Sequence, residues 1–218
     1  MSEDHDHSQG HGHQHDRGWR AIVRYVRLAP KMWTSPVNRA VIDLLDLRTG
    51  ERVLDIGAGM GPSAVLAAHA GSHVVAVDPM PFMRGVLGVR RLWQRSRKRI
   101  EIIDGVVEDL PAQDASVDAT WAINAMHHWT DLHAGVAELH RVLRPGGRLV
   151  LVDENFDDPT HPDHDRIRSH PRESHHEFDD VDPAVVGAEL SAAGFTVSEA
   201  DETILAGRPA KLIRAIRT

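Results

Sequence analysis

The sequence contains no cysteine, and only 5% of its 218 residues are aromatic. Without cysteine the chain can form no disulfide and offers no thiolate to a metal ion, which excludes disulfide-stapled folds and cysteine-ligated zinc sites. The sequence also lacks the run of about 20 apolar residues that a membrane-spanning helix needs, and no signal peptide is visible. These absences predict a cytoplasmic protein with no membrane partner.

The sequence also has no excess of positively charged residues. Against 25 lysines and arginines stand 32 aspartates and glutamates, so the formal net charge is -7 at pH 7. A negative chain argues against nonspecific binding of nucleic acid, and we expect no nucleic-acid partner. What is present suits a globular fold, because 41% of the residues are hydrophobic and a chain of this length can bury a substantial core.

The first 16 residues differ in composition from the remainder of the chain. They hold five histidines and four acidic residues, with almost no apolar side chain. Such a segment is expected to be disordered, and its imidazoles and carboxylates would bind divalent metal ions loosely. A specific metal site in this tail is the less favoured alternative. Residues 17–218 are then expected to form a single domain.

Two short apolar runs, at residues 53–56 and 74–77, have the length and branched composition of buried parallel strands. Between them stand three glycines at positions 57, 59 and 61, followed by Pro62, a pattern typical of a tight turn that opens a helix. Bare backbone and a helix N-terminus should therefore meet a ligand at this turn.

Asp78 follows the second run, at the carboxyl end of the strand, where ligands bind in open α/β sheets. A carboxylate in that place can accept hydrogen bonds from the two neighbouring hydroxyls of a ribose. The glycine spacing is G-x-G-x-G, whereas dinucleotide-binding loops carry G-x-G-x-x-G. The pattern therefore argues against a dinucleotide as the ligand.

The loop resembles the nucleoside-binding loop of class I S-adenosylmethionine-dependent methyltransferases, which follows "LD" as it does here. Three further segments are similar to that family, in the order it requires: "VEDLP" at 107–111, "WAINAMHHW" at 121–129 and "LRPGGRLVLVD" at 143–153. Together the four segments cover about residues 35 to 155. In general appearance the chain is similar to small-molecule and glycan O-methyltransferases of actinobacteria.

The resemblance implies an α/β fold of the Rossmann-like methyltransferase class, with a seven-stranded, mostly parallel sheet, an antiparallel terminal strand and helices on both faces. It also implies that the cofactor is S-adenosylmethionine, with the glycine loop around its amino-acid part and ribose and Asp78 at the ribose hydroxyls. The implied cofactor-binding residues are Asp55, Gly57, Ala58, Gly59, Gly61, Asp78, Pro79, Glu108, Asp109, Leu110 and Asn124.

Apolar periodicity predicts the remaining elements. The expected helices span about residues 19–27, 36–47, 80–99 and 131–143, and a last helix begins near 183. The expected strands span about residues 100–103, 117–123 and 148–152, with 195–200 and 212–216 as a terminal antiparallel pair. The helix at 80–99 carries seven arginines and lysines, which a solvated basic face would explain.

A long acidic and histidine-rich segment departs from a minimal methyltransferase, and we expect it to be an insertion at about 154–181. Residues 153–182 hold eleven acids and five histidines, in a connection too long for an ordinary loop between strand and helix. Loops at the carboxyl edge of an α/β sheet often determine substrate selectivity. The segment could bind a divalent ion, fold over a hydroxyl-rich acceptor, or be a solvated insertion.

Transfer of a sulfonium methyl group needs mainly alignment, but a hydroxyl or carbon-acid acceptor also needs a base. His127 and His128 lie at the expected rim of the site, and imidazole suits this role. Adjacent residues at a strand end point in different directions, so one of the two should face the pocket. Asp153 and Glu154 end the fifth strand and would hold Mg²⁺ or grip substrate hydroxyls. The expected catalytic residues are His127, His128 and Glu154, and the expected metal ligands are Asp153 and Glu154.

The leading hypothesis is O-methylation of a small hydroxyl compound such as a sugar or glycoside, with Mg²⁺ as an optional ligand. An N- or C-methyltransferase of a small metabolite is the alternative enzyme. From another class, the chain could be a metal-responsive module that binds the cofactor without turnover. The protein could also form a homodimer.

Overall fold

The computed structural model describes residues 33–168 and 181–218. The histidine-rich segment 1–16, the helix expected at 19–27 and residues 169–180 of the expected insertion lie outside the described residues.

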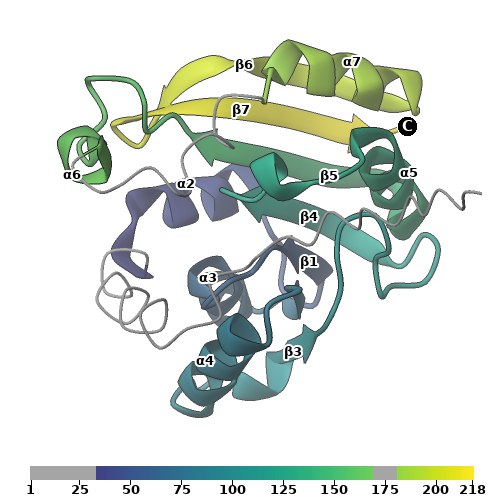
Figure 1. Cartoon of the computed structure of the whole chain (residues 1–218). Helices are drawn as coiled ribbons and strands as arrows, with labels where there is room; N and C mark the ends of the chain where they lie inside the picture. Colours follow the sequence, from purple (N-terminus) through teal and green to yellow (C-terminus); the bar gives the residue numbers. More distant parts are fainter. Residues whose placement is uncertain (1–32, 169–180) are drawn as a thin grey trace, which may run out of the picture.

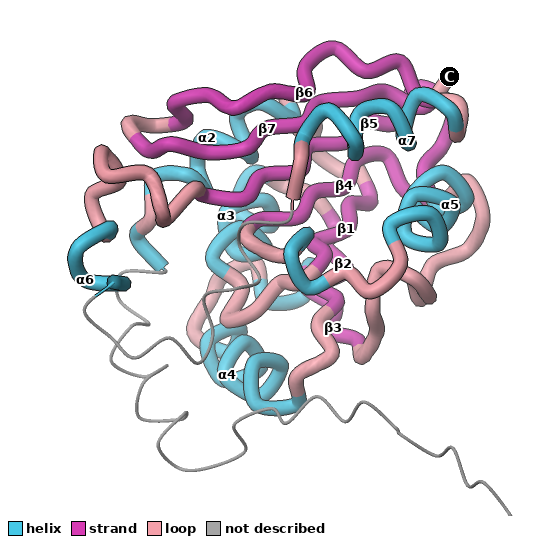
Figure 2. Tube along the Cα trace, turned by 45° about the horizontal axis from the view of Figure 1, so that its top comes forward, coloured by secondary structure: helices cyan, strands magenta, loops and turns pink. Residues whose placement is uncertain are grey.

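Seven strands form one sheet in the order β3-β2-β1-β4-β5-β7-β6. The strands are β1 (Arg52–Ile56), β2 (His73–Val77), β3 (Ile100–Ile103), β4 (Val117–Ile123), β5 (Leu143–Glu154), β6 (Phe195–Leu205) and β7 (Arg208–Arg217). The pairs from β3 to β5 are parallel, whereas β7 runs antiparallel to both β5 and β6. Figures 1 and 2 show β3 and β6 at the two edges of the sheet. The expected sheet, mostly parallel with an antiparallel strand near its end, is confirmed.

Helices cover both faces of the sheet, which is also as expected. One face carries α2 (Pro36–Leu45), α3 (Pro62–Ala70) and α4 (Pro81–Leu92), and the other carries α5 (Leu132–Val142) and α7 (Pro183–Ala192) (Figure 1). Alternation along the strands supplies both cores: Val75 packs toward α5 and α7, and its neighbour Val74 packs toward α2 and α3. The parallel strands therefore end together at one edge, where a ligand can reach their carboxyl ends.

The helix expected at 80–99 is shorter than predicted. It ends at Leu92, and a turn and the 3-10 helix η1 (Arg97–Arg99) lead into β3. Arg91 donates from its guanidinium to the carbonyl of Ile100, and Arg99 donates to the carbonyl of Gly71. These bonds draw the chain back toward the sheet edge, so the basic residues do not continue one regular helix.

The terminal hairpin is longer than predicted. β6 and β7 extend through residues 195–205 and 208–217 and are joined by Ala206 and Gly207, which both have positive φ, 52° and 77°. Two positive φ values are what a type I′ hairpin turn requires. Glu154, where the insertion expected at about 154–181 would begin, is the last residue of β5, and α6 (His164–Arg168) follows it. The insertion itself stays a prediction. Within the described ranges, no helix is both long enough and apolar enough to span a membrane.

Candidate active site

The glycine loop joins β1 to α3, and its three glycines serve different purposes. Gly57, Gly59 and Gly61 all have positive φ. A Cβ added at Gly57 would lie 2.6 Å from the Cβ of Ala125, and one at Gly61 would lie 2.2 Å from a methyl group of Leu87. A Cβ at Gly59 would meet nothing closer than 3.9 Å. Gly57 and Gly61 are therefore needed for close packing, whereas Gly59 presents bare backbone to open space.

Asp78, at the end of β2, is held against this loop by backbone donors. The N–H of Gly59 donates to its Oδ2 at 2.7 Å, and the N–H of Met80 donates to its Oδ1 at 2.8 Å. Burial raises the pKa of the Asp78 carboxyl, and the two backbone hydrogen bonds counter that effect. Each carboxylate oxygen can accept a second hydrogen bond. The side chain is thus fixed in place with acceptor capacity left for a diol.

Ala58 and Asp55, two other residues predicted to bind the cofactor, are buried and hold the glycine loop against β2 and α3. Ala58 is buried, and its N–H donates to the carbonyl of Val77 at 3.0 Å, which ties the loop to β2. Asp55 is also buried, and Ser63 donates its hydroxyl hydrogen to Asp55 Oδ2 at 2.7 Å. Burial, with a smaller effect from the charge of Asp78, raises the pKa of Asp55 to about 7. Asp55 therefore braces the start of α3 and changes charge near neutral pH.

At the end of β4, a 3-10 turn, η2 (Met126–His128), is organised by the carboxylate of Asp153. Asp153 Oδ1 accepts hydrogen bonds from the backbone N–H groups of Ala125, at 3.0 Å, and Met126, at 3.4 Å. Asp153 Oδ2 lies 3.1 Å from both the backbone nitrogen and Nδ1 of His127. The Asp153 carboxylate is buried. It therefore fixes both the turn and the ring that the turn carries.

His127 and His128 occupy different environments. The His127 side chain is only 2% exposed and forms a pair with Asp153, whereas His128 is exposed. Their ring centroids are 4.0 Å apart. Because a carboxylate accepts hydrogen bonds, the contact assigns the ring hydrogen of neutral His127 to Nδ1 and leaves Nε2 as the basic nitrogen. Of the two histidines expected as bases, His127 is the buried one that a carboxylate orients, and His128 is exposed.

Glu154 is the centre of a second buried polar group. Its backbone N–H donates to Asn124 Oδ1 at 2.7 Å, and Asn124 Nδ2 donates back to Glu154 Oε1 at 2.9 Å. The other oxygen, Oε2, lies 3.1 Å from His161 Nε2 and 2.9 Å from a guanidinium nitrogen of Arg208. Asn124 adopts a left-handed conformation, with φ 53°, to make this exchange. These bonds join the ends of β4, β5 and β7.

The connection after β5 closes this group. His161 Nδ1 accepts from the N–H of Asp163 at 3.1 Å, so His161 Nε2 carries the hydrogen that is donated to Glu154. Arg208 also reaches Asp163 Oδ2 at 3.3 Å. The sequence identified residues 161–165 only as a cluster of acids and histidines. It gave no signal for Arg208, which lies 54 residues beyond Glu154.

The expected metal role of Asp153 and Glu154 finds no support in the described residues. Both carboxylates are buried and receive hydrogen bonds from protein donors on each oxygen. Across residues 33–168 and 181–218, no group of three or more histidines and acids is arranged to hold a metal ion. The two carboxylates serve here to position Asn124, His127 and His161.

Of the three residues expected to contact adenine, Glu108, Asp109 and Leu110, only Asp109 is exposed. Glu108 Oε1 accepts from the N–H groups of Thr130, at 2.7 Å, and Asp131, at 3.2 Å, which anchors the loop after η2. Leu110 is buried, and its N–H donates to the side chain of Glu138. Asp109 is exposed, as is Pro79 beside Asp78. Glu108 and Leu110 therefore hold the segment in place, and Asp109 faces outward.

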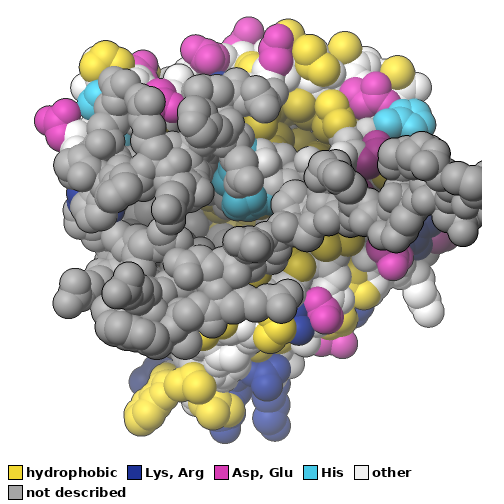
Figure 3. Space-filling view, in the orientation of Figure 1, with side chains coloured by type: hydrophobic (Ala, Val, Ile, Leu, Met, Phe, Trp, Pro, Cys, Tyr) yellow, Lys and Arg dark blue, Asp and Glu magenta, His cyan; other side chains and the backbone are white. Residues whose placement is uncertain are grey.

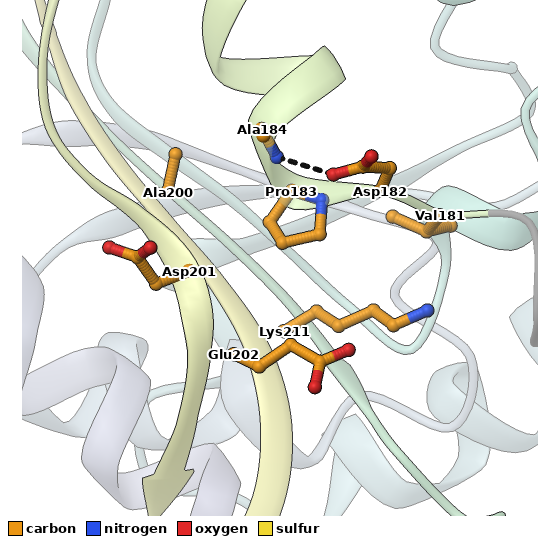
Figure 4. Close-up of a pocket in the computed structure, with 8 residues that line it drawn as sticks. All are labelled: Val181, Asp182, Pro183, Ala184, Ala200, Asp201, Glu202 and Lys211. Carbon is orange, nitrogen blue, oxygen red and sulfur yellow. Dashed lines mark hydrogen bonds between the residues drawn. The ribbon is translucent and has the colours of Figure 1, made fainter.

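A cavity of about 450 Å³ lies elsewhere on the same molecule, between the start of α7 and the terminal hairpin. Figure 4 shows Pro183 on one side of it, with Glu202 of β6 and Lys211 of β7 on the other. Neither the glycine loop nor η2 contributes to its lining. The candidate active site is therefore defined by the bonded groups at the carboxyl edge and not by this cavity.

Comparison with known proteins agrees with this geometry. Residues 54–151 match a family described as "Methyltransferase domain". The chain is 37% identical over 123 residues to a demethylmenaquinone methyltransferase of Clavibacter sepedonicus, covering 56% of this chain and 47% of the relative. It is 32% identical over 169 residues to an uncharacterized 37.1 kDa protein in transposon TN4556 of Streptomyces fradiae, covering 72% of this chain and 47% of that protein. The chain thus spans about half the length of the curated relatives it matches.

Solved structures show the same fold. A SAM dependent methyltransferase from Aquifex aeolicus superposes with a TM-score of 0.64 at 20% identity, covering 85% of this chain and 94% of that chain. At this identity the likeness concerns the fold.

Proposed function

The chain belongs to the class I S-adenosylmethionine-dependent methyltransferase family, and from this premise we propose that it methylates a small molecule whose accepting group must first lose a proton. The observation that carries the proposal is the buried pair of His127 and Asp153, with 3.1 Å between Nδ1 and Oδ2. A histidine oriented by a carboxylate is a general base whose proton-accepting nitrogen is fixed.

The described residues fit the cofactor. Asp78 holds a carboxylate ready for the ribose hydroxyls, and Gly59 leaves the backbone beside it uncovered. Bound S-adenosylmethionine supplies a methyl group on a positively charged sulfur, already activated for in-line displacement. The chain then has two tasks, which are to align the acceptor and to remove its proton.

His127 is suited to the second task by its position as well as its partner. The turn that carries it follows Ala125, and Ala125 packs directly against Gly57 of the glycine loop. As His127 Nε2 takes a proton, the negative charge of Asp153 stabilises the imidazolium that forms. Glu154 was expected to be a catalytic residue that binds substrate hydroxyls or Mg²⁺. Because it is bonded to Asn124 and His161, its proposed role is to shape the site.

The acceptor is proposed from the strength of this base. Imidazole removes a proton far more readily from a ring hydroxyl, with an ordinary pKa of about 10 as in tyrosine, than from an alcohol. Asp153 and Glu154 were expected to bind the hydroxyls of a saccharide, but both are bonded within the protein. This argues against a saccharide as the acceptor. O-methylation of a hydroxyaromatic compound is therefore our leading assignment.

C-methylation of the same kind of ring is the second candidate. Removing the proton of a ring hydroxyl also raises the electron density on ring carbons, so one base serves either outcome. The specific observation in its favour is the 37% identity to a protein named demethylmenaquinone methyltransferase.

The test measures transfer of a labelled methyl group to four acceptors: a monophenol, a hydroquinone, a methyl glycoside and a primary amine. Labelling of the phenol or hydroquinone is expected, and product analysis separates O- from C-methylation. His127→Ala should lower this turnover by about 10² to 10⁴ with cofactor affinity unchanged in calorimetry. His128→Ala is the matched control and should stay near wild type. Full turnover in His127→Ala, or labelling of the amine alone, would refute the base mechanism.

A further inference from the structure

Three large apolar side chains are exposed at the C-terminal end of α4: Val89 and Leu92 in the helix, and Trp93, which caps it. Val89 is 62% exposed, Leu92 is 63% exposed and Trp93 is 85% exposed. Positions three and four apart share one face of a helix, so these residues form a single patch, called here the α4 patch. The opposite side of the helix carries Met83 and Leu87, which are buried. Helix α4 therefore has one apolar face packed on the protein and another facing outward.

Positive charge surrounds the α4 patch. Seven arginines and lysines and no acid lie between Asp78 and Glu101, although the whole chain has a net charge of -7. Arg95, Arg97 and Lys98 are exposed just beyond the helix. In Figure 3, hydrophobic and basic side chains lie side by side at the bottom of the molecule, where Figure 1 places α4.

The remaining cations beside the patch are held by the fold. Arg90 donates to the carbonyl of Met60 and places its guanidinium 4.8 Å from the centre of the Trp33 ring. Arg91 donates to the carbonyl of Ile100. Val89 and Trp93 of the patch also line a cavity of about 750 Å³, together with Trp33 and Phe82. The charges and the apolar surface are therefore kept in a fixed relation.

We propose that the α4 patch docks reversibly on the surface of an anionic lipid bilayer. Tryptophan and leucine insert at the boundary between headgroups and acyl chains, where amphipathic helices with a basic polar face bind. Arg95, Arg97 and Lys98 then lie at the depth of the lipid phosphates, whose negative surface potential attracts them. The proposed binding is peripheral and needs no membrane-spanning helix, and it departs from the expectation from sequence that the protein has no membrane partner.

The charges around the α4 patch favour an anionic bilayer over two other binding partners, a second copy of the chain and nucleic acid. A second copy of the chain, related by a two-fold axis through the patch, would bring two sets of cations face to face. Nucleic acid would satisfy the cations, but its phosphates offer nothing to Val89 and Leu92. An anionic bilayer complements the charge and the apolar surface together.

The test uses the full chain without cofactor, so it is independent of the proposed chemistry. Protein is sedimented with vesicles of phosphatidylcholine alone and with vesicles containing roughly one third phosphatidylglycerol. The wild type should bind the anionic vesicles, and added salt should weaken binding because the attraction is screened. The double variant Leu92→Ser, Trp93→Ala should bind at least about tenfold more weakly. Ile204→Ser is the matched control, since Ile204 is 65% exposed on β6, and it should bind as the wild type does.

Three results would overturn the proposal. The first is absence of wild-type binding to anionic vesicles at low salt, and the second is equal binding by the double variant. The third is evidence that something else binds the patch. This would be a dimer in sedimentation equilibrium that Leu92→Ser dissociates, or an RNA oligonucleotide that displaces the protein from the vesicles. Circular dichroism of each variant confirms that the fold is retained.

Discussion

Replacing Asp55 with asparagine should remove a pH dependence of stability that this buried carboxyl imposes on the protein. Asp55 is 2% exposed and accepts a hydrogen bond from Ser63, and burial raises its pKa from 3.8 to about 7. Asparagine keeps the size of the side chain and an oxygen for Ser63, but it cannot ionise. The substitution therefore isolates the charge.

The sign of the effect follows from proton binding. Between pH 4 and pH 7 the folded state retains a proton on Asp55 that the unfolded state has already released. The free energy of unfolding therefore falls as the pH rises through this window, and it becomes level above pH 7. Over the two pH units from 5 to 7, at about 1.4 kcal/mol for each unit, the loss is about 2 to 3 kcal/mol.

Urea denaturation at pH 5, 6, 7 and 8 measures this loss directly. The free energy of unfolding of Asp55→Asn, minus that of the wild type, should increase by about 2 to 3 kcal/mol from pH 5 to pH 7 and then stay constant. Asp43→Asn, at an exposed position of α2, is the matched control for the loss of a carboxylate and should change the free energy of unfolding by less than about 0.5 kcal/mol. A pH-independent difference for Asp55→Asn would refute the reasoning.

Two further substitutions test the packing of the site. Gly57→Ala should destabilise the protein by about 1 to 3 kcal/mol more than Gly59→Ala in urea denaturation. The Cβ at residue 57 would lie 2.6 Å from a side-chain atom, whereas the nearest atom to a Cβ at residue 59 is 3.9 Å away; equal midpoints would contradict the assignment of Gly57 to packing. Arg208→Gln should cost about 3 to 5 kcal/mol of unfolding free energy, because it leaves the buried carboxylate of Glu154 without its cation. Arg95→Gln, at an exposed arginine, is the comparison and should cost less than about 0.5 kcal/mol; similar losses for both would show that the buried pair adds nothing.

The strands of the central sheet could be predicted from the sequence because burial on both faces leaves a strong local signal. Residues 53–56 and 74–77 are mostly branched and apolar, with Asp55 as the one polar residue, and both runs lie in strands of the structure. The same reasoning missed residues 201–205 of β6, where two exposed acids, Asp201 and Glu202, interrupt the apolar pattern at the edge of the sheet. An edge strand needs only one apolar face, so its run is interrupted.

The roles of site residues were harder to predict, because a short motif does not reveal its long-range partners. The loop and Asp78 occupy the expected places, since glycine spacing and strand order are local features. Glu108 bonds to backbone groups 22 and 23 residues further along the chain, and Asp153 bonds to a turn 26 to 28 residues earlier. Only the folded geometry distinguishes a carboxylate that holds a loop from one that holds a ligand.

The fixed position of the Asp78 carboxylate has a consequence for the pace of catalysis. Its two oxygens are oriented by the N–H groups of Gly59 and Met80, so little ordering would remain for the proposed binding of a ribose. The ribose is common to S-adenosylmethionine and to the demethylated product, S-adenosylhomocysteine. Affinity gained there is the same before and after the reaction, so it raises retention of the product without lowering the barrier to methyl transfer. With the proposed function, release of S-adenosylhomocysteine is therefore the step that we expect to limit turnover.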